Sequence, residues 1–204
     1  YILKVIFLMK RIFFLNPPSY EGFDGGAGSR YQAKREVRSF WYPTWLAQTA
    51  ALCPESKVLD APVEEMSPEE TIKAIRGFDV VVIYTSTAGY ANDARLVTHL
   101  KEEYPGILVG MVGPHCTILP DETLKNCKAL DFVARKEFDY TILEIAQGKP
   151  LSEIQGISYV HDGKIVHNPD RPVIEDMDAL PSVLDVYKRD ISIEKYFIGY
   201  LLHP

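Results

Sequence analysis

Short apolar runs alternate with segments of helical spacing along most of the chain. The clearest runs, residues 79–84 and 107–112, are rich in branched apolar residues and stop at polar residues or glycine, as strands buried on both faces of a parallel sheet do. Shorter runs of the same kind occupy residues 11–15, 57–60 and 132–134. Five strands separated by helices predict an α/β fold, with a doubly wound five-stranded parallel sheet of the Rossmann or flavodoxin type.

Helical spacing is found in five segments, residues 43–52, 67–77, 88–104, 121–127 and 138–147. The second has the clearest start, because Ser67 can act as N-cap and Pro68 suits the first helical position. Glycine at positions 77 and 148 is expected to end the helices that precede it. Residues 19–42 have no period and contain four glycines, and so long a connection is expected to be functional or mobile.

The pattern changes after residue 148. Two short alternating runs, 157–160 and 164–167, flank Asp162-Gly163, and an Asp-Gly pair in this setting predicts a β-hairpin. From residue 168 onward the prolines and aspartates predict a linker without a closing element.

We therefore expect three parts. Residues 1–8 are interpreted as a tail or upstream extension, because Met9 could be the true start; an extra edge strand is the alternative. Residues 9–150 form the α/β domain. Residues 151–204 form a hairpin and linker that lead to a missing domain.

Composition and charge narrow the functional classes. Hydrophobic residues make up 47% of the chain and charged residues 25%, which is typical of a soluble globular protein. The 22 basic and 28 acidic residues give a net charge of −6, which argues against a general nucleic-acid binder. The apolar N-terminal run is interrupted by Lys4, Lys10 and Arg11 and is too short to span a membrane. Three cysteines without a C-x-x-C pair fit a reducing cytoplasm and suggest neither disulfides nor a zinc site.

Four loops at the carboxyl ends of the predicted strands are the expected ligand positions, because doubly wound sheets bind ligands outside these ends. They begin at Asn16, Thr85, Gly113 and Arg135. The segment Thr85-Ser86-Thr87 offers three hydroxyl groups near a helix start. Such a segment suits a phosphate or an amide-bearing ligand, or it only caps the helix.

The segment Gly113-Pro114-His115 places an imidazole where glycine permits close approach of a ligand to the backbone. A helix-capping role for His115 is weighed equally. Cys116 is interpreted as a buried apolar residue rather than a nucleophile, and Trp45 as core and helix-docking material. The histidines lack metal-ligand spacing, and no G-x-G-x-x-G or Walker loop follows a strand, so neither a metal site nor ordinary nucleotide binding is predicted.

Several motifs together carry a family resemblance. They are Asn16-Pro17-Pro18, Thr85-Ser86-Thr87, Val112-Gly113-Pro114-His115-Cys116-Thr117, Ile154-Gln155-Gly156-Ile157-Ser158-Tyr159 and Met177-Asp178-Ala179-Leu180-Pro181. With these motifs the chain resembles, from Met9 onward, the N-terminal cobalamin-binding domain and connector of B12-dependent radical SAM enzymes. It looks most like the hopanoid-biosynthesis-associated radical SAM proteins. Magnesium-protoporphyrin ester oxidative cyclases share the domain plan.

The resemblance implies that cobalamin binds in the base-off mode, with its nucleotide tail entering between the first and third strands and the corrin over the four loops. It implies cofactor contacts from nine residues, Asn16, Pro17, Thr85, Ser86, Thr87, Gly113, Pro114, His115 and, more weakly, Glu137. It implies no catalytic and no metal-ligating residue in this chain.

The chain departs from the family pattern in three places. Residues 16–28 contain no histidine, so the D-x-H-x-x-G motif is absent and the first loop cannot supply a lower axial ligand. Val112 stands where the family often has a first glycine. After the fifth strand the family often has Gly-Glu, and only Glu137 can be matched there.

Radical SAM chemistry needs a C-x-x-x-C-x-x-C motif to hold a [4Fe–4S] cluster. Cys53, Cys116 and Cys127 lack that spacing, so the cluster and S-adenosylmethionine are implied only for the missing C-terminal domain. This chain alone is not expected to be active. We expect it to belong to a cytoplasmic enzyme that modifies a lipid-like or other apolar substrate, in hopanoid biosynthesis, with peripheral membrane contact through that substrate as a further option.

Three alternatives stay open. The domain could be a cofactor-free scaffold or substrate-presenting domain of the same enzyme, or belong to a cyclase-like relative. It could also be a free-standing flavodoxin-like or response-regulator-like module. The response-regulator reading requires an acidic cluster after the first strand, which Asn16-Pro17-Pro18 does not provide.

Overall fold

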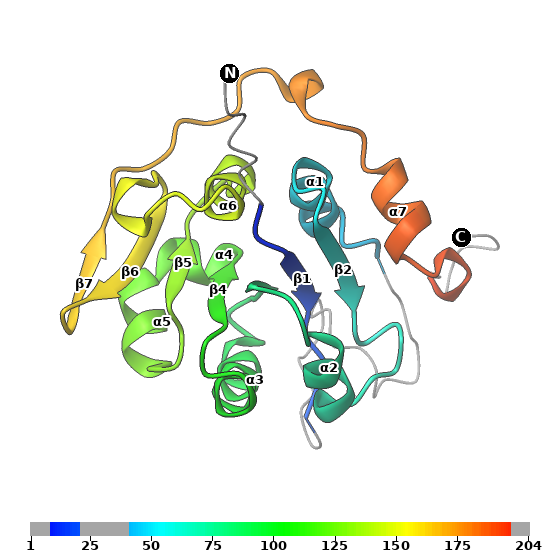
Figure 1. Ribbon diagram of the computed structural model, residues 1–204, viewed down its shortest axis with the longest axis horizontal. Helices are drawn as coiled ribbons and strands as arrows, with labels where there is room; N and C mark the ends of the chain where they lie inside the picture. Colours follow the sequence, from blue (N-terminus) through cyan, green and yellow to red (C-terminus); the bar gives the residue numbers. More distant parts are fainter. Residues whose placement is uncertain (1–8, 21–40, 197–204) are drawn as a thin grey trace, which may run out of the picture.

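A single mixed β-sheet forms the centre of the computed structural model, which describes residues 9–20 and 41–196 (Figure 1). The expected tail at residues 1–8 and most of the long loop at 19–42 lie outside the described residues. Among the described residues the strands are β1 (Ile12–Asn16), β2 (Ser56–Asp60), β3 (Val80–Tyr84), β4 (Leu108–Val112), β5 (Phe132–Ala134), β6 (Ile157–His161) and β7 (Lys164–His167). Their order across the sheet is β2-β1-β3-β4-β5-β6-β7.

The predicted α/β fold with a doubly wound sheet is confirmed, but the predicted number of five strands is wrong. Strands β1 to β5 are parallel, and the predicted hairpin extends the same sheet, because β6 pairs antiparallel with β5 through Phe132 and Tyr159. The hairpin turn itself matches the prediction. Asp162 (φ 49°) and Gly163 (φ 72°) have the positive φ values of a two-residue turn.

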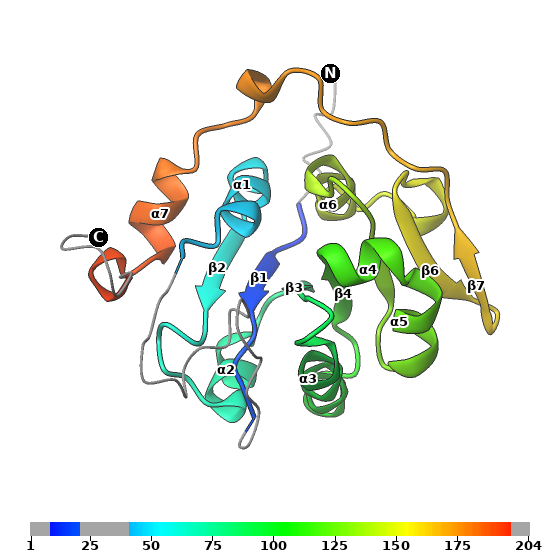
Figure 2. The same ribbon diagram turned by 180° about the vertical axis from the view of Figure 1, so that it is seen from behind.

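Helices cover both faces of the sheet (Figures 1 and 2). Helices α1 (Thr44–Leu52) and α6 (Asp139–Ala146) lie on one face, and α2 (Pro68–Ala74), α3 (Tyr90–Glu103) and α5 (Pro120–Asn126) lie on the other, with the short α4 (Pro114–Ile118) before α5. Strand β1 shows why two layers form. Ile12 and Phe14 belong to the apolar cluster under α1 and α6, whereas Phe13 and Leu15 belong to the opposite cluster.

The start of α2 follows the prediction. The Ser67 hydroxyl accepts a hydrogen bond from the backbone N–H of Glu70 at 3.2 Å, and the Glu70 carboxylate accepts one from the backbone N–H of Ser67 at 2.9 Å. This reciprocal capping box satisfies two N–H groups that a helix start would otherwise leave unpaired. After α6, Gly148 adopts a φ of 81°, as expected of a glycine that ends a helix.

The C-terminal part differs from the expected linker. Residues 168–183, here called the strap, are largely irregular and run along the outer side of α6 and α1, away from the sheet (Figures 1 and 2). The strap is attached near both helices. The Glu137 carboxylate, just before α6, accepts a hydrogen bond from the backbone N–H of Ile174 at 2.6 Å. The side-chain amide of Gln48 in α1 donates one to the Pro181 carbonyl at 3.0 Å. The expectation that no closing element follows is wrong, since α7 (Leu184–Asp190) packs beside α1 and β2.

Helix α7 protects the exposed edge of the sheet at β2. The side chain of Asp190 is only 5% exposed, and its carboxylate accepts a hydrogen bond from the backbone N–H of Val58 at 2.9 Å. Beyond α7, the Tyr196 hydroxyl donates to the Asp60 carboxylate at 2.9 Å. The last described segment therefore occupies an edge that would otherwise present unpaired backbone groups.

Gly110 marks the closest contact inside the sheet. A Cβ atom at this position in β4 would lie 2.0 Å from the ring of the neighbouring Phe132, which is fully buried. The absence of a side chain at position 110 thus makes room for the aromatic ring on the next strand.

We predict that Gly110→Ala lowers the free energy of unfolding by about 1–3 kcal/mol, because the packed core cannot accept the added methyl group without moving Phe132. Urea unfolding measures the change. Gly106→Ala is the matched control, since a Cβ at that exposed position has no neighbour within 4 Å. Equal stability of the two variants would contradict this account of the packing.

We also predict that Asp190→Ala lowers the free energy of unfolding by about 1–3 kcal/mol, because it leaves the partly buried Val58 N–H without its acceptor. Lys188→Ala, at an exposed position of the same helix, should change it by less than about 0.5 kcal/mol. Thermal unfolding of the two variants checks the difference. If Asp190→Ala unfolds together with the control, α7 contributes nothing through this bond.

Candidate functional site

The carboxyl ends of the five parallel strands meet at one edge of the sheet, called here the carboxyl edge. Strand β1 lies between β2 and β3, and the chain crosses from β1 to β2 on one side and from β3 to β4 on the other. The gap between β1 and β3 is therefore the switch in strand order, where doubly wound sheets bind ligands. The four predicted loops, which begin at Asn16, Thr85, Gly113 and Arg135, all start at this edge.

The end of β1 is buried. Asn16 is 5% exposed, and its amide donates a hydrogen bond to the Asp60 carboxylate at 2.5 Å. The amide oxygen of Asn16 is buried and has no hydrogen-bond partner among the described residues. Pro17 is also buried. This loop therefore offers a ligand one unused acceptor at the switch point rather than an exposed side chain.

The hydroxyl groups after β3 differ in their exposure. Thr85 is fully buried; its N–H donates to the Val112 carbonyl at 2.9 Å and its hydroxyl to the Ser86 carbonyl at 3.3 Å. The hydroxyl of the half-buried Ser86 accepts from the N–H of Gly89 at 3.3 Å. Thr87 is exposed. Of the three predicted hydroxyl residues, Thr87 is thus the most exposed, and its hydroxyl lies within hydrogen-bond distance of the His115 ring.

The loop after β4 depends on glycine. Gly113 has a φ of 111°, and a Cβ there would lie 2.4 Å from the Thr85 carbonyl oxygen, so this position requires glycine for both reasons. Pro114 then begins α4 and is exposed. Gly113 thereby brings the backbone ends of β3 and β4 together, and Pro114 is left on the surface of the carboxyl edge.

His115 points into the protein. It is 4% exposed and stacks on the Tyr90 ring, with centroids 4.3 Å apart, while its Nδ1 lies 3.3 Å from the Thr87 hydroxyl. The other ring nitrogen, Nε2, is buried and has no hydrogen-bond partner among the described residues. Burial lowers the pKa of His115 below its ordinary value, which favours the neutral imidazole at pH 7.

The loop after β5 is occupied by the strap. Arg135 is 8% exposed and donates to the Ile157 and Asn168 carbonyls and to the Asp170 carboxylate. The Glu137 carboxylate, the ninth predicted contact, accepts from the strap residue Ile174. Both side chains therefore have partners within the chain.

Sequence reasoning missed several residues that shape this edge. Asp60 joins Asn16 to Tyr196, and Tyr90 covers His115. Trp45 and Tyr84 form an aromatic pair with ring centroids 4.8 Å apart. A signal existed for Asp60, which is the last residue of a predicted strand. For the aromatic partners there was no such signal, because neither Tyr84 nor Tyr90 stands out in the sequence.

The three cysteines are poor candidates for a reactive nucleophile. All three cysteines are buried, and burial raises the pKa of each thiol, that of Cys53 to about 12, which disfavours the reactive thiolate.

Within residues 9–20 and 41–196, no group of three or more His, Cys, Asp or Glu residues could hold a metal ion. The helices of this described part include none long and apolar enough to cross a membrane.

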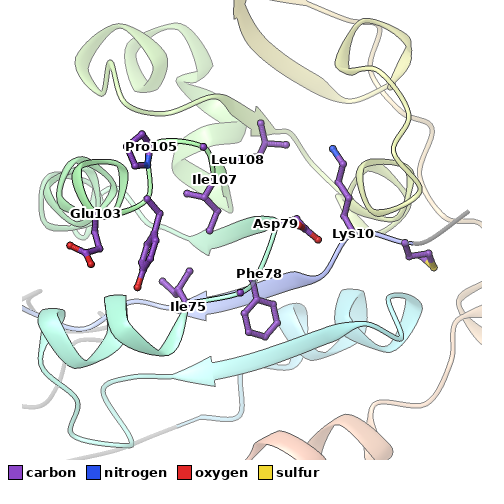
Figure 3. A pocket seen from close by; sticks show the side chains of 12 residues that line it. Lys10, Ile75, Phe78, Asp79, Glu103, Pro105, Ile107 and Leu108 are labelled. Carbon is purple, nitrogen blue, oxygen red and sulfur yellow. The ribbon is translucent and has the colours of Figure 1, made fainter.

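A cavity of about 850 Å³ lies at the opposite, amino edge of the sheet (Figure 3). Ile75, Phe78 and Ile107 supply apolar side chains to its lining, and Lys10 and Asp79 supply charged ones. The Asp79 carboxylate already accepts a hydrogen bond from the backbone N–H of Arg11 at 2.7 Å. We do not assign the function to this cavity, because ligands of doubly wound sheets bind at the carboxyl edge.

Comparison with known proteins identifies the family. The profile of the B12 binding domain matches residues 33–146, which is more than half of the chain. The chain is 31% identical over 172 residues to an uncharacterized methyltransferase of Pyrococcus horikoshii, covering 77% of this chain and 38% of the relative. It is 26% identical over 185 residues to the anaerobic magnesium-protoporphyrin IX monomethyl ester cyclase of Rubrivivax gelatinosus, covering 83% and 31%.

A solved structure supports the fold. The radical S-adenosylmethionine methyltransferase TsrM from Kitasatospora setae, with cobalamin and a [4Fe-4S] cluster bound, matches 85% of this chain and 31% of its own with a TM-score of 0.60 and 14% identity. At that identity the likeness concerns the fold alone. The chain spans about a third of the length of these relatives. The family match and the doubly wound sheet together show that the chain belongs to the B12 binding domain family.

Proposed function

We propose that the chain binds cobalamin at its carboxyl edge as one domain of a radical SAM enzyme. The observation that carries the proposal is the match of the B12 binding domain over residues 33–146, which include the ends of β3, β4 and β5. The chain's similarity to a methyltransferase and a cyclase supports an enzymatic context. Cobalamin supplies the difficult chemistry when it is bound, and the residues of the chain bind and orient it.

The residues at the carboxyl edge fit such a ligand. The corrin rim carries amide groups, which donate and accept hydrogen bonds. The unused Asn16 oxygen can accept, and the exposed Thr87 hydroxyl can do both. Pro114 adds an exposed apolar surface beside them. In this proposal Thr85, Gly113 and His115 do not contact the ligand directly. They fix the backbone positions of the loops that do.

The proposal includes the base-off mode. The first loop contains no histidine in residues 16–28, so it cannot supply a lower axial ligand. His115, which lies at the carboxyl edge, is stacked against Tyr90 and buried. A nucleotide tail released from cobalt would enter at the switch point between β1 and β3.

The rest of the enzyme is also part of the proposal. Because the relatives are about three times as long, we place S-adenosylmethionine and the [4Fe–4S] cluster in a domain beyond this chain. We propose a hopanoid-type lipid as substrate from the sequence resemblance, and a porphyrin is the alternative suggested by the cyclase relative. The lipid and porphyrin profiles of a host that lacks the protein would distinguish the two.

A cofactor-free scaffold is the second candidate. One observation favours it: Thr85, His115 and Glu137, all predicted cofactor contacts, direct their side chains to partners within the protein. A scaffold and a cobalamin domain differ in a property that is simple to measure, the retention of corrin.

We predict that the protein, at its full native length and under anaerobic conditions, retains hydroxocobalamin through gel filtration, as measured by corrin absorbance. Pro114→Glu should weaken binding by about tenfold or more, because it places a bulky charge beside the corrin. Pro105→Glu is the matched control, an exposed proline at the amino edge. It should bind like the wild type.

Two results would count against the proposal. If the wild-type protein retains no corrin, the scaffold is the better account. If Pro114→Glu and Pro105→Glu bind equally well, cobalamin binds elsewhere on the protein.

A further inference from the structure

Trp45 and Tyr84 form an aromatic pair on the α1 side of the carboxyl edge. Trp45 lies in the first turn of α1 and Tyr84 is the last residue of β3. Their ring centroids are 4.8 Å apart, with the ring planes inclined by 34°. Both side chains are partly buried and pack against the apolar cluster under α1 and α6. The pair therefore connects the helix that follows β1 with the end of β3, the two strands that border the switch point.

The Tyr84 ring also reaches the end of β4. A Cβ atom at Gly113 would lie 3.3 Å from Cε2 of Tyr84, so the tyrosine ring covers the glycine of the fourth loop. The aromatic pair thus extends along the α1 face from α1 to Gly113. It links α1 with two of the strand ends at which we place the corrin.

The indole N–H of Trp45 distinguishes this aromatic pair from ordinary core packing. Its Nε1 atom is buried and has no hydrogen-bond partner among the described residues. Buried indole N–H groups normally find an acceptor, and an unpaired one destabilises the folded protein. Packing alone does not require this donor, because a phenylalanine ring would fill an apolar site without it. An unpaired donor at a ligand edge therefore indicates an acceptor on the ligand.

The neighbouring contacts limit where that acceptor can be. One turn further along α1, the Thr49 hydroxyl donates to the Asp139 carboxylate of α6 at 2.8 Å. This bond joins α1 and α6 just inside the carboxyl edge. A group that reaches Trp45 must therefore enter from the edge between the two helices, on the same face as the indole ring. Of the parts of cobalamin, the nucleotide tail is long and narrow enough to enter there, and it carries phosphate, ribose and base acceptors.

We propose that Trp45 is a binding residue for the nucleotide tail of cobalamin, with its indole N–H donating to an acceptor of the tail and Tyr84 holding the ring in place. This inference rests on the proposed function, since it names the part of the ligand that one side chain recognises. It assigns a ligand contact to a residue that the sequence alone places in the core.

The test compares cobalamin with cobinamide, which has the corrin but lacks the phosphate, ribose and base. We expect Trp45→Phe to weaken cobalamin binding by about tenfold or more and to change cobinamide binding by less than about twofold, because only cobalamin presents the acceptor. Trp41→Phe is the matched control, since Trp41 is 64% exposed. It should leave both affinities unchanged.

A second measurement leaves Trp45 intact. These 204 residues contain two tryptophans, so a protein of this length with Trp41→Phe has a single indole N–H resonance in a ¹⁵N–¹H spectrum. Added Co(III) cobalamin should move that resonance downfield and slow its exchange with water, as a new hydrogen bond does. Cobinamide should leave it near its original position. This measurement decides the question if Trp45→Phe does not fold.

The outcomes separate this inference from the proposed function. If the wild-type protein binds neither cobalamin nor cobinamide, the proposed function fails. If it binds both, the inference fails in either of two cases: Trp45→Phe weakens both ligands equally or neither of them, or the indole resonance responds equally to both.

Discussion

The burial of β1 on both faces is the constraint on which the rest of the structure depends. All five of its residues are buried, and the side chains of the four apolar ones alternate between two apolar clusters. Such a strand needs a helix layer on each side, which α1 with α6 and α2 with α3 provide. Helices that cover both faces leave the strand ends as the places where a ligand can approach the central strands. The position of the site thus follows from the hydrophobic core rather than from a particular polar residue.

Much of this arrangement could be predicted from the sequence, because the runs at 79–84 and 107–112 are apolar at consecutive positions and need no distant partner to be recognised as strands. The hairpin was equally visible in Asp162-Gly163. The pairing of this hairpin with β5 could not be predicted, because contact between Phe132 and Tyr159 depends on which edge of the sheet remains open. Helix α7 escaped prediction because Val186 is its one fully buried residue, which leaves no helical stripe to detect.

The sequence predicted which candidate residues lie together at one edge of the sheet, but not the directions of their side chains. Parallel strands bring their carboxyl ends together whatever the loops contain, so Asn16, Thr85 and Gly113 could be predicted to lie at one edge of the sheet, as they do in the structure. Whether a side chain after a strand points outward depends on the first turn of the next helix and on its neighbours. Stacking on Tyr90 turns His115 inward, a contact that sequence spacing does not reveal. Glu137 likewise binds a strap residue far away in sequence.

The same edge also holds the C-terminal part of the chain at two points. Arg135 and Glu137 fix the strap to the loop after β5, and Asp60 accepts the hydroxyl of Tyr196 beside Asn16. Removing a buried guanidinium from water is unfavourable, and Arg135 offsets that penalty by donating to carbonyl and carboxylate oxygens on β6 and the strap. A displacement of either loop would have to break these bonds or carry the attached segment with it. The loops at which we propose that cobalamin binds and the C-terminal segment from the strap to Tyr196 are therefore joined by hydrogen bonds.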